Sequence, residues 1–155
     1  MSLCRTDLGH RLIESLFLFQ HSLVFRCRKK RYLQELPTVS VIVIFYNEHW
    51  STLLRTVYSV LNRSPSHLLK EIVLVNDHST KEFLCEPLQD FVQSELAPKV
   101  KLINLPVRSG LITARLTGAK AATGDVLIVL DSHTEVNVNW LPPLLGKIMA
   151  FVTTH

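Results

Sequence analysis

Hydrophobic and polar positions after Pro37 alternate between short apolar runs and longer amphipathic stretches. Four runs, at residues 39–45, 71–75, 100–105 and 125–130, are almost continuously apolar and rich in β-branched side chains. This pattern is typical of parallel strands that are buried on both faces. The stretches between and after them predict helices over residues 53–62, 81–96, 110–122 and 139–151. The series therefore predicts an α/β fold, a Rossmann-like parallel sheet with flanking helices.

The ends of the predicted helices carry their own signals. Ser51 is a good N-cap residue for the first helix, because its hydroxyl can accept a free backbone N–H. Pro87 weakens the second helix near its first turns. Gly124 follows the third helix and is expected to stop it, since glycine readily adopts the left-handed conformation that ends many helices.

Charge separates the first 36 residues from the rest of the chain. The 155-residue chain has a net charge of +4, and residues 1–36 hold seven of the 17 basic and three of the 13 acidic residues. The balanced remainder does not indicate a nucleic-acid partner. We interpret residues 1–36 as a separate basic segment with an amphipathic helix. Its charge run is either a solvated tail or a contact for an acidic membrane or partner. The apolar residues 12–25 are too few, and too often interrupted, for a membrane span.

Polar residues follow each predicted strand. In a parallel sheet the carboxyl ends of the strands meet at one edge, where such folds bind their ligands. Asp131 and His133 follow the last strand, and in an extended conformation both side chains would point to the same side. A carboxylate and an imidazole suit Mn²⁺, with a diphosphate and water as further ligands. The alternative is a plain polar turn after a buried strand.

Two further residues fit a nucleotide site at the same edge. Asp77 follows the second strand, where a carboxylate can bind a ribose or a base, although it can equally cap the next helix. Arg108 precedes Ser109 and Gly110 at a helix start, where a guanidinium and free N–H groups would hold phosphate; an ordinary loop arginine is the alternative. The first strand lacks the G-x-G-x-x-G motif, which disfavours NAD and FAD.

Several segments, in order and with matching spacing, resemble the polypeptide N-acetylgalactosaminyltransferases. They are LPTVSVIVIFYNEHWSTLLRTVYSVLNRSP, KEIVLVNDHS, RSGLITAR, TGDVLIVLDSH and the subsequent WLPPLL. The resemblance implies a partial A-type glycosyltransferase fold, with residues 37–155 as the N-terminal half of a family 2-like glycosyltransferase domain. It also implies Mn²⁺ dependence and transfer of GalNAc from UDP-GalNAc to serine or threonine of proteins in the Golgi, with retention of configuration.

Residue by residue, the resemblance makes Asp131 and His133 metal ligands, Asp77 a uridine contact and Arg108 a further UDP contact. It names no catalytic residue. The chain departs from the family pattern at Asn76, Ser109 and Thr134, where the family usually has Asp, Glu and Cys.

The family's third metal ligand, a downstream histidine, and its acceptor-binding and lectin parts would lie beyond the last residue of this chain. We therefore expect a chain that binds UDP-GalNAc weakly and has no turnover by itself. The alternative is an inactive nucleotide-sugar-binding module or a regulatory or degenerate paralogue. We also expect the strand at residues 125–130 to be an open, aggregation-prone edge.

Overall fold

The computed structural model describes residues 35–152. The chain divides into two compact units, residues 1–33 and 34–155. Almost all of the predicted basic segment, residues 1–36, therefore lies outside the described residues, and its predicted helix stays a prediction. The second unit contains all four of the predicted strands.

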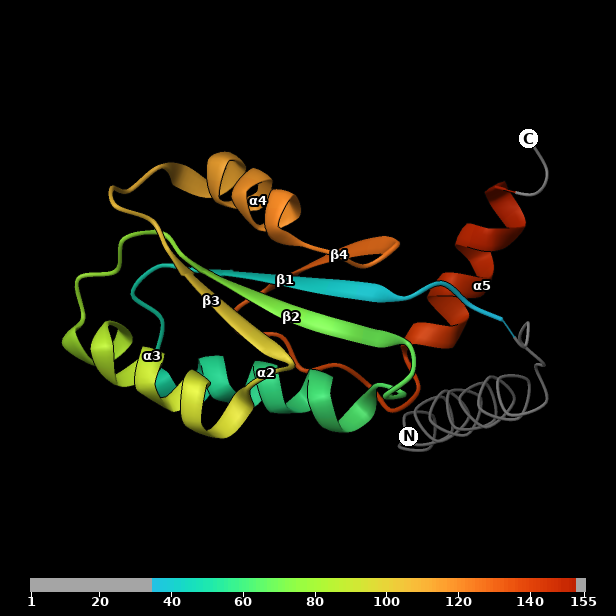
Figure 1. Cartoon of the computed structure of the whole chain (residues 1–155), viewed down its shortest axis with the longest axis horizontal. Helices are drawn as coiled ribbons and strands as arrows, with labels where there is room; N and C mark the ends of the chain where they lie inside the picture. The colour runs from blue at the N-terminus through green and yellow to red at the C-terminus, as the bar shows by residue number, and fades with distance from the viewer. Residues whose placement is uncertain (1–34, 153–155) are drawn as a thin grey trace, which may run out of the picture. The chain divides into compact units, whose positions relative to one another are not determined.

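Four parallel strands form the sheet, as the apolar runs predict. The strands are β1 (Val39–Phe45), β2 (Leu69–Asn76), β3 (Val100–Asn104) and β4 (Val126–Asp131), in the spatial order β3-β2-β1-β4 (Figure 1). Ile44 near the end of β1 lies opposite Val75 of β2 and Asp131 of β4. All four carboxyl ends therefore reach the same edge of the sheet.

Helices cover both faces of the sheet. The α-helices are α2 (Trp50–Arg63), α3 (Glu86–Phe91), α4 (Gly110–Ala121) and α5 (Leu141–Val152). Helix α4 lies over one face, and α2 and α3 lie over the other (Figure 1). Within residues 35–152, none of the helices has the length and apolar character needed to cross a bilayer.

The central strand β1 is buried on both sides, which explains its continuous apolar sequence. Val41 and Val43 belong to the larger core cluster, which includes Val57 and Val60 of α2. Ile42, between them, belongs to a second cluster with Ala114 of α4. Successive side chains of a strand point to opposite faces, so a strand between two helix layers needs apolar residues at every position.

The predicted helix over residues 81–96 is not one helix. The structure has a 3₁₀ turn at Glu82–Leu84, then α3, then a π-helical turn at Val92–Leu96. Pro87 lies in the first turn of α3, where the N–H that proline lacks would have no helical partner. The expectation that Pro87 weakens a helix already under way is therefore wrong, because the residue stands at the start of a shorter one.

Ser51 is not the N-cap of the first helix, because α2 begins at Trp50 and His49 occupies the cap position without a side-chain hydrogen bond. Gly124 does not end α4 in a left-handed conformation either. The helix ends at Ala121, and Gly124 is not among the described residues with positive φ. Instead, a Cβ at Gly124 would lie 2.6 Å from the backbone nitrogen of Ser40. The glycine is needed because this loop packs directly against β1.

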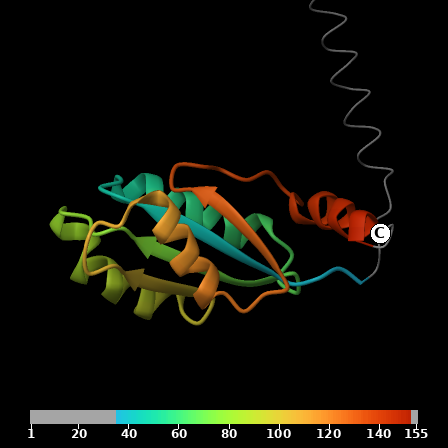
Figure 2. The ribbon, with the colours of Figure 1, turned by 90° about the horizontal axis from the view of Figure 1, so that it is seen from above.

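Strand β4 is an edge strand of the described sheet. It pairs with β1, and within residues 35–152 no strand pairs with its other side (Figure 2). Leu127 and Val129, on one face of β4, are 45% and 41% exposed. An apolar edge with free N–H and C=O groups is a template for pairing with another chain.

We expect this chain to self-associate at tens of micromolar, and Val129→Lys to reduce the association. Lysine on an edge strand opposes strand addition because pairing would bury its charge. Val138→Lys is the matched control, since Val138 is 78% exposed but lies after β4. Sedimentation velocity measures the result. A parent chain that stays monomeric, or equal behaviour of the two variants, would contradict the expectation.

Candidate functional site at the carboxyl edge of the sheet

The loops that follow β1 and β2 are joined by Asn47. Its side-chain Oδ1 accepts the backbone N–H of Thr80 at 2.8 Å, and its Nδ2 donates to the Thr80 hydroxyl at 3.1 Å. Its own backbone N–H donates to the Ser79 hydroxyl at 3.0 Å. Asn47 has a φ of 52°, in the left-handed region that asparagine tolerates better than most residues. These contacts fix the chain directly beside Asp77.

Asp77 holds the start of α4. Its side chain is buried, at 4% exposure, and Oδ1 accepts the N–H of Ser109 at 2.7 Å while Oδ2 accepts the N–H of Gly110 at 3.0 Å. These are N–H groups at the start of a helix, which need partners and carry partial positive charge. Asp77 thus caps a helix, although that helix is α4 after β3 rather than the element that follows β2. A nucleotide contact of Asp77 stays a prediction.

Arg108 immediately precedes the backbone that Asp77 holds. Its guanidinium carbon lies 3.9 Å from the centre of the Tyr46 ring, which follows β1. This is a cation–π contact at the surface, since both side chains are exposed. Within the described residues the guanidinium forms no ion pair. Its N–H groups can therefore bind an anion at this edge.

Asp131 and His133 lie on a turn rather than on a continued strand. β4 ends at Asp131, and the N–H of Thr134 donates to the Asp131 carbonyl at 3.3 Å. The expected extended conformation through His133 is therefore wrong. The Thr56 hydroxyl of α2 donates to the Ser132 carbonyl at 2.7 Å, which anchors the turn. Both predicted metal ligands, Asp131 and His133, are exposed.

Glu48, which the sequence did not single out, connects the ends of β1 and β4. Its Oε2 accepts the Ser132 hydroxyl at 2.8 Å and lies 3.5 Å from Nδ1 of His133, and its Oε1 accepts the His49 N–H at 2.9 Å. Burial alone would raise the pKa of Glu48. The hydrogen bonds from His49 and Ser132, together with the nearby imidazole of His133, outweigh burial and lower the pKa of Glu48 below its usual value. The sequence does show that Glu48 follows an apolar strand, which is a signal for a site residue. It does not show which strand lies beside β1, so the contact of Glu48 with the end of β4 could not be predicted.

The donor set at the end of β4 suits an open cation site. Across residues 35–152, no group of three or more His, Cys, Asp or Glu side chains is placed to hold a metal ion. Asp131 and His133 provide one carboxylate and one imidazole, both accessible to solvent. Such a pair fits a divalent cation only when oxygen atoms of a diphosphate and water complete its coordination.

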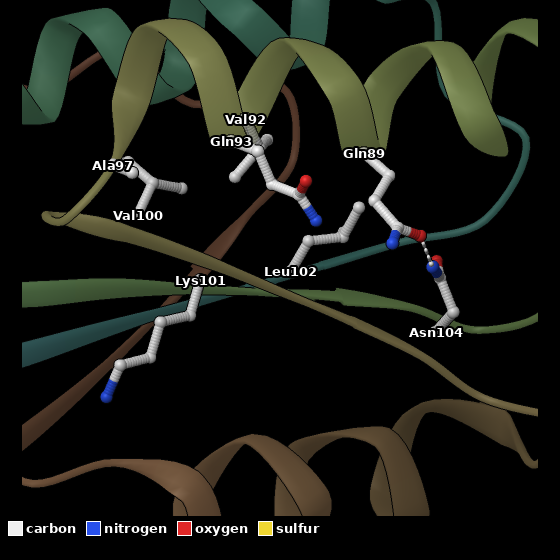
Figure 3. A pocket seen from close by; sticks show the side chains of 8 residues that line it. All are labelled: Gln89, Val92, Gln93, Ala97, Val100, Lys101, Leu102 and Asn104. Atoms are coloured by element: carbon white, nitrogen blue, oxygen red, sulfur yellow. Dashed lines mark hydrogen bonds between the residues drawn. The ribbon is translucent and has the colours of Figure 1, made fainter.

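Two concave pockets lie away from the carboxyl edge. One cavity, of about 380 Å³, lies between β3 and the helical segments α3 and Val92–Leu96; Gln89 there contacts Asn104 at 3.5 Å (Figure 3). Another, of about 210 Å³, lies along α2 beside Arg63 and Glu135. Neither lining includes any of the four predicted site residues. Ligands of parallel α/β sheets bind at the carboxyl edge of the sheet, and that is where the four predicted site residues lie.

Comparison with known sequences places the chain among glycosyltransferases. The model of Glycosyl transferase family 2 matches residues 40–152. Polypeptide N-acetylgalactosaminyltransferase 10 of Homo sapiens is 57% identical over 122 residues, which cover 79% of this chain and 20% of that protein. N-acetylgalactosaminyltransferase 6 of Drosophila melanogaster is also 57% identical over 122 residues, covering 79% and 18%. The chain thus matches about a fifth of the length of these relatives.

Solved structures agree with the sequence relatives. The crystal structure of GalNAc-T7 with UDP, GalNAc and Mn²⁺ has a TM-score of 0.73 and 48% identity, covering 76% of this chain and 22% of that one. TarS of S. aureus with UDP-GlcNAc has a TM-score of 0.56 and 25% identity, covering 76% and 32%. A mannosyltransferase of Pyrobaculum calidifontis, 20% identical with a TM-score of 0.61, shares the fold over 84% of this chain and 38% of its own. The chain has part of an A-type glycosyltransferase fold and belongs to glycosyltransferase family 2, and the two sequence relatives reported above are N-acetylgalactosaminyltransferases.

Proposed function

We propose that the carboxyl edge of the sheet binds UDP-GalNAc together with Mn²⁺. Residues 37–155 are then the N-terminal, nucleotide-sugar-binding half of a polypeptide N-acetylgalactosaminyltransferase domain. The whole enzyme would modify serine or threonine of proteins in the Golgi. One observation carries the proposal: Asp77 holds the start of α4, which places Arg108 at the same sheet edge as Asp131 and His133. The similar fold of GalNAc-T7 with UDP, GalNAc and Mn²⁺ supports it.

Each residue of this edge has a distinct role in the proposal. Arg108 binds the diphosphate through charge-assisted hydrogen bonds. Asp77 orients the Arg108 loop and contacts the uridine. Asp131 and His133 hold the cation, which offsets negative charge on the UDP leaving group.

A second candidate function is nucleotide-sugar binding without turnover. The observation that favours it is the set of only two protein metal ligands at the carboxyl edge within residues 35–152. Incubation with UDP-GalNAc and a threonine-rich peptide, followed by mass spectrometry, separates the two functions. Glycopeptide above a no-protein control would assign turnover to this chain, whereas UDP binding without glycopeptide would support the binding module.

Calorimetric titration with UDP tests the site itself. We expect tighter binding with Mn²⁺ than with EDTA, and Asp131→Ala should abolish this difference because it removes the anionic ligand. Arg108→Ala should weaken UDP binding by roughly 1.5–3 kcal/mol with or without Mn²⁺, as for a charge-assisted hydrogen bond. Asp90→Ala and Arg115→Ala, at exposed helical positions, are the matched controls. A parent chain whose UDP affinity is indifferent to Mn²⁺ would require the metal assignment to be withdrawn.

A further inference from the structure

The turn that carries His133 is fixed at the residue before it. Ser132 is 6% exposed, its carbonyl accepts the Thr56 hydroxyl of α2 and its own hydroxyl donates to Glu48. The backbone of His133 therefore has a defined position even though its imidazole is exposed. The orientation of the ring, and the nitrogen that carries its proton, need a further contact.

Glu48 meets the imidazole at one nitrogen. Its Oε2 lies 3.5 Å from Nδ1 of His133, at ion-pair distance, and the carboxylate is itself held by the His49 N–H on its other oxygen. The Glu48 side chain is only 19% exposed. Both of its oxygens have donors, and it is the less accessible of the two partners, so it suits a supporting role rather than a direct cation contact.

We propose that Glu48 is a positioning residue that keeps the proton of neutral His133 on Nδ1 and leaves Nε2 free to bind a divalent cation. A carboxylate can only accept, so the nitrogen that faces it must be the donor. Histidines that bind metals commonly donate their other ring N–H to a carboxylate or carbonyl, which fixes ring and tautomer. The role of Nε2 rests on the proposed cation site, whereas the pairing of Glu48 with His133 does not.

Long-range ¹H–¹⁵N NMR on the metal-free protein tests the pairing. At about pH 8, above the ordinary pKa of histidine, we expect His133 to be mainly the Nδ1–H tautomer. His67, an exposed histidine, is the internal reference. Glu48→Gln should shift the tautomer ratio of His133 toward that of His67. A glutamine amide can either accept or donate a hydrogen bond, so the imidazole nitrogen that faces it no longer has to carry the proton. Glu135→Gln is the matched control: it removes a carboxylate two residues from His133 that pairs with Arg63 instead.

Ser132→Ala tests whether the His133 tautomer depends on the hydroxyl that anchors the turn or on the Glu48 carboxylate. It removes the hydroxyl that binds the same Glu48 oxygen, yet the Nδ1–H preference should remain, because the carboxylate remains. If His133 in the parent matches His67, or if its tautomer ratio is unchanged in Glu48→Gln, the pairing is overturned. The parent measurement decides this even if Glu48→Gln does not fold.

Mn²⁺ binding in the presence of UDP, measured by electron paramagnetic resonance, tests whether Glu48 supports the proposed cation site. Loss of a supporting partner typically weakens metal binding roughly 10–100-fold, and we expect Glu48→Gln to fall in this range while Glu135→Gln does not change. A parent with the Nδ1–H tautomer but no bound Mn²⁺ would overturn the cation site and leave the pairing supported. Equal Mn²⁺ affinity of parent and Glu48→Gln would overturn the positioning role.

Discussion

Glu71→Gln should lower the free energy of unfolding by about 3 kcal/mol at neutral pH, because the folded protein stabilises the ionised form of this carboxyl group. Glu71 is 3% exposed at the amino end of the sheet. Its Oε1 accepts the Ser40 hydroxyl at 2.9 Å and the N–H and hydroxyl of Thr123 at 2.6 and 2.7 Å, and its Oε2 pairs with Lys101. One carboxylate thus joins β1, β2, β3 and the loop before β4.

The same carboxylate predicts how stability depends on pH. Burial raises the pKa of Glu71, but the ion pair with Lys101 and the hydrogen bonds outweigh it and lower the pKa from 4.5 to about 2. The folded-state pKa lies below the unfolded one, so the contribution is complete above about 4.5 and is lost as the pH falls toward 2. Urea denaturation of the parent and Glu71→Gln at neutral and acid pH measures this.

The stability difference between parent and Glu71→Gln should stay constant from neutral pH to about pH 4.5 and then shrink as the pH falls to about 2. Glu95→Gln, at an exposed helical position, is the matched control and should follow the parent throughout. A difference that is the same at both ends of the range would show that Glu71 is not ionised in this network.

Asp77→Ala should weaken UDP binding about equally with and without Mn²⁺ and should also destabilise the fold. Two backbone N–H groups at the start of α4 lose their charged acceptor, and a hydrogen bond to a charged group is worth roughly 1.5–3 kcal/mol. The Arg108 loop then loses its anchor, so the phosphate contact that we propose there weakens without any change at the cation. Calorimetry and urea denaturation of the same variant measure the two effects.

A double-mutant cycle separates the two ways in which Asp77 can act on UDP. If Asp77 acts only by positioning Arg108, its substitution should have little further effect in an Arg108→Ala background. Additive losses would instead indicate a direct contact of Asp77 with the nucleotide. Asp90→Ala again serves as the control, and an Asp77→Ala chain with unchanged stability would contradict the capping role.

The sheet was predictable from sequence because strands buried on both faces leave long apolar runs. Polar residues at the strand ends were equally visible, and topology alone brings them to one edge. The sequence did not show which strands lie side by side in the sheet. For that reason the contacts of Asp77 with α4 and of Glu48 with Ser132 were missed, although each residue lies directly after a predicted strand or close to its end.

Predictions made from neighbouring residues in the sequence failed at positions where the three-dimensional fold explains why that residue type is present. Gly124 follows a helix and suggested a helix stop, yet its lack of a side chain serves an approach to Ser40, a residue far away in the sequence. Pro87 suggested a weak point inside a long helix, because sequence alone does not show that the chain turns before it. In both cases the residue type correctly indicated a constraint on the backbone. The cause of that constraint is visible only in the folded structure.

The central place of β1 in the sheet has a consequence for the newborn chain. β1 is the first strand of the sheet to be synthesised, and β2 can pair with it soon afterwards. Its other partner comes much later: Thr38 and Asp125, which bond at the start of β1 and β4, are 87 residues apart. At ribosomal elongation rates this delay is roughly 4–17 s. During that time one side of β1 has unpaired backbone groups, so the half-made sheet offers an apolar strand edge to other chains.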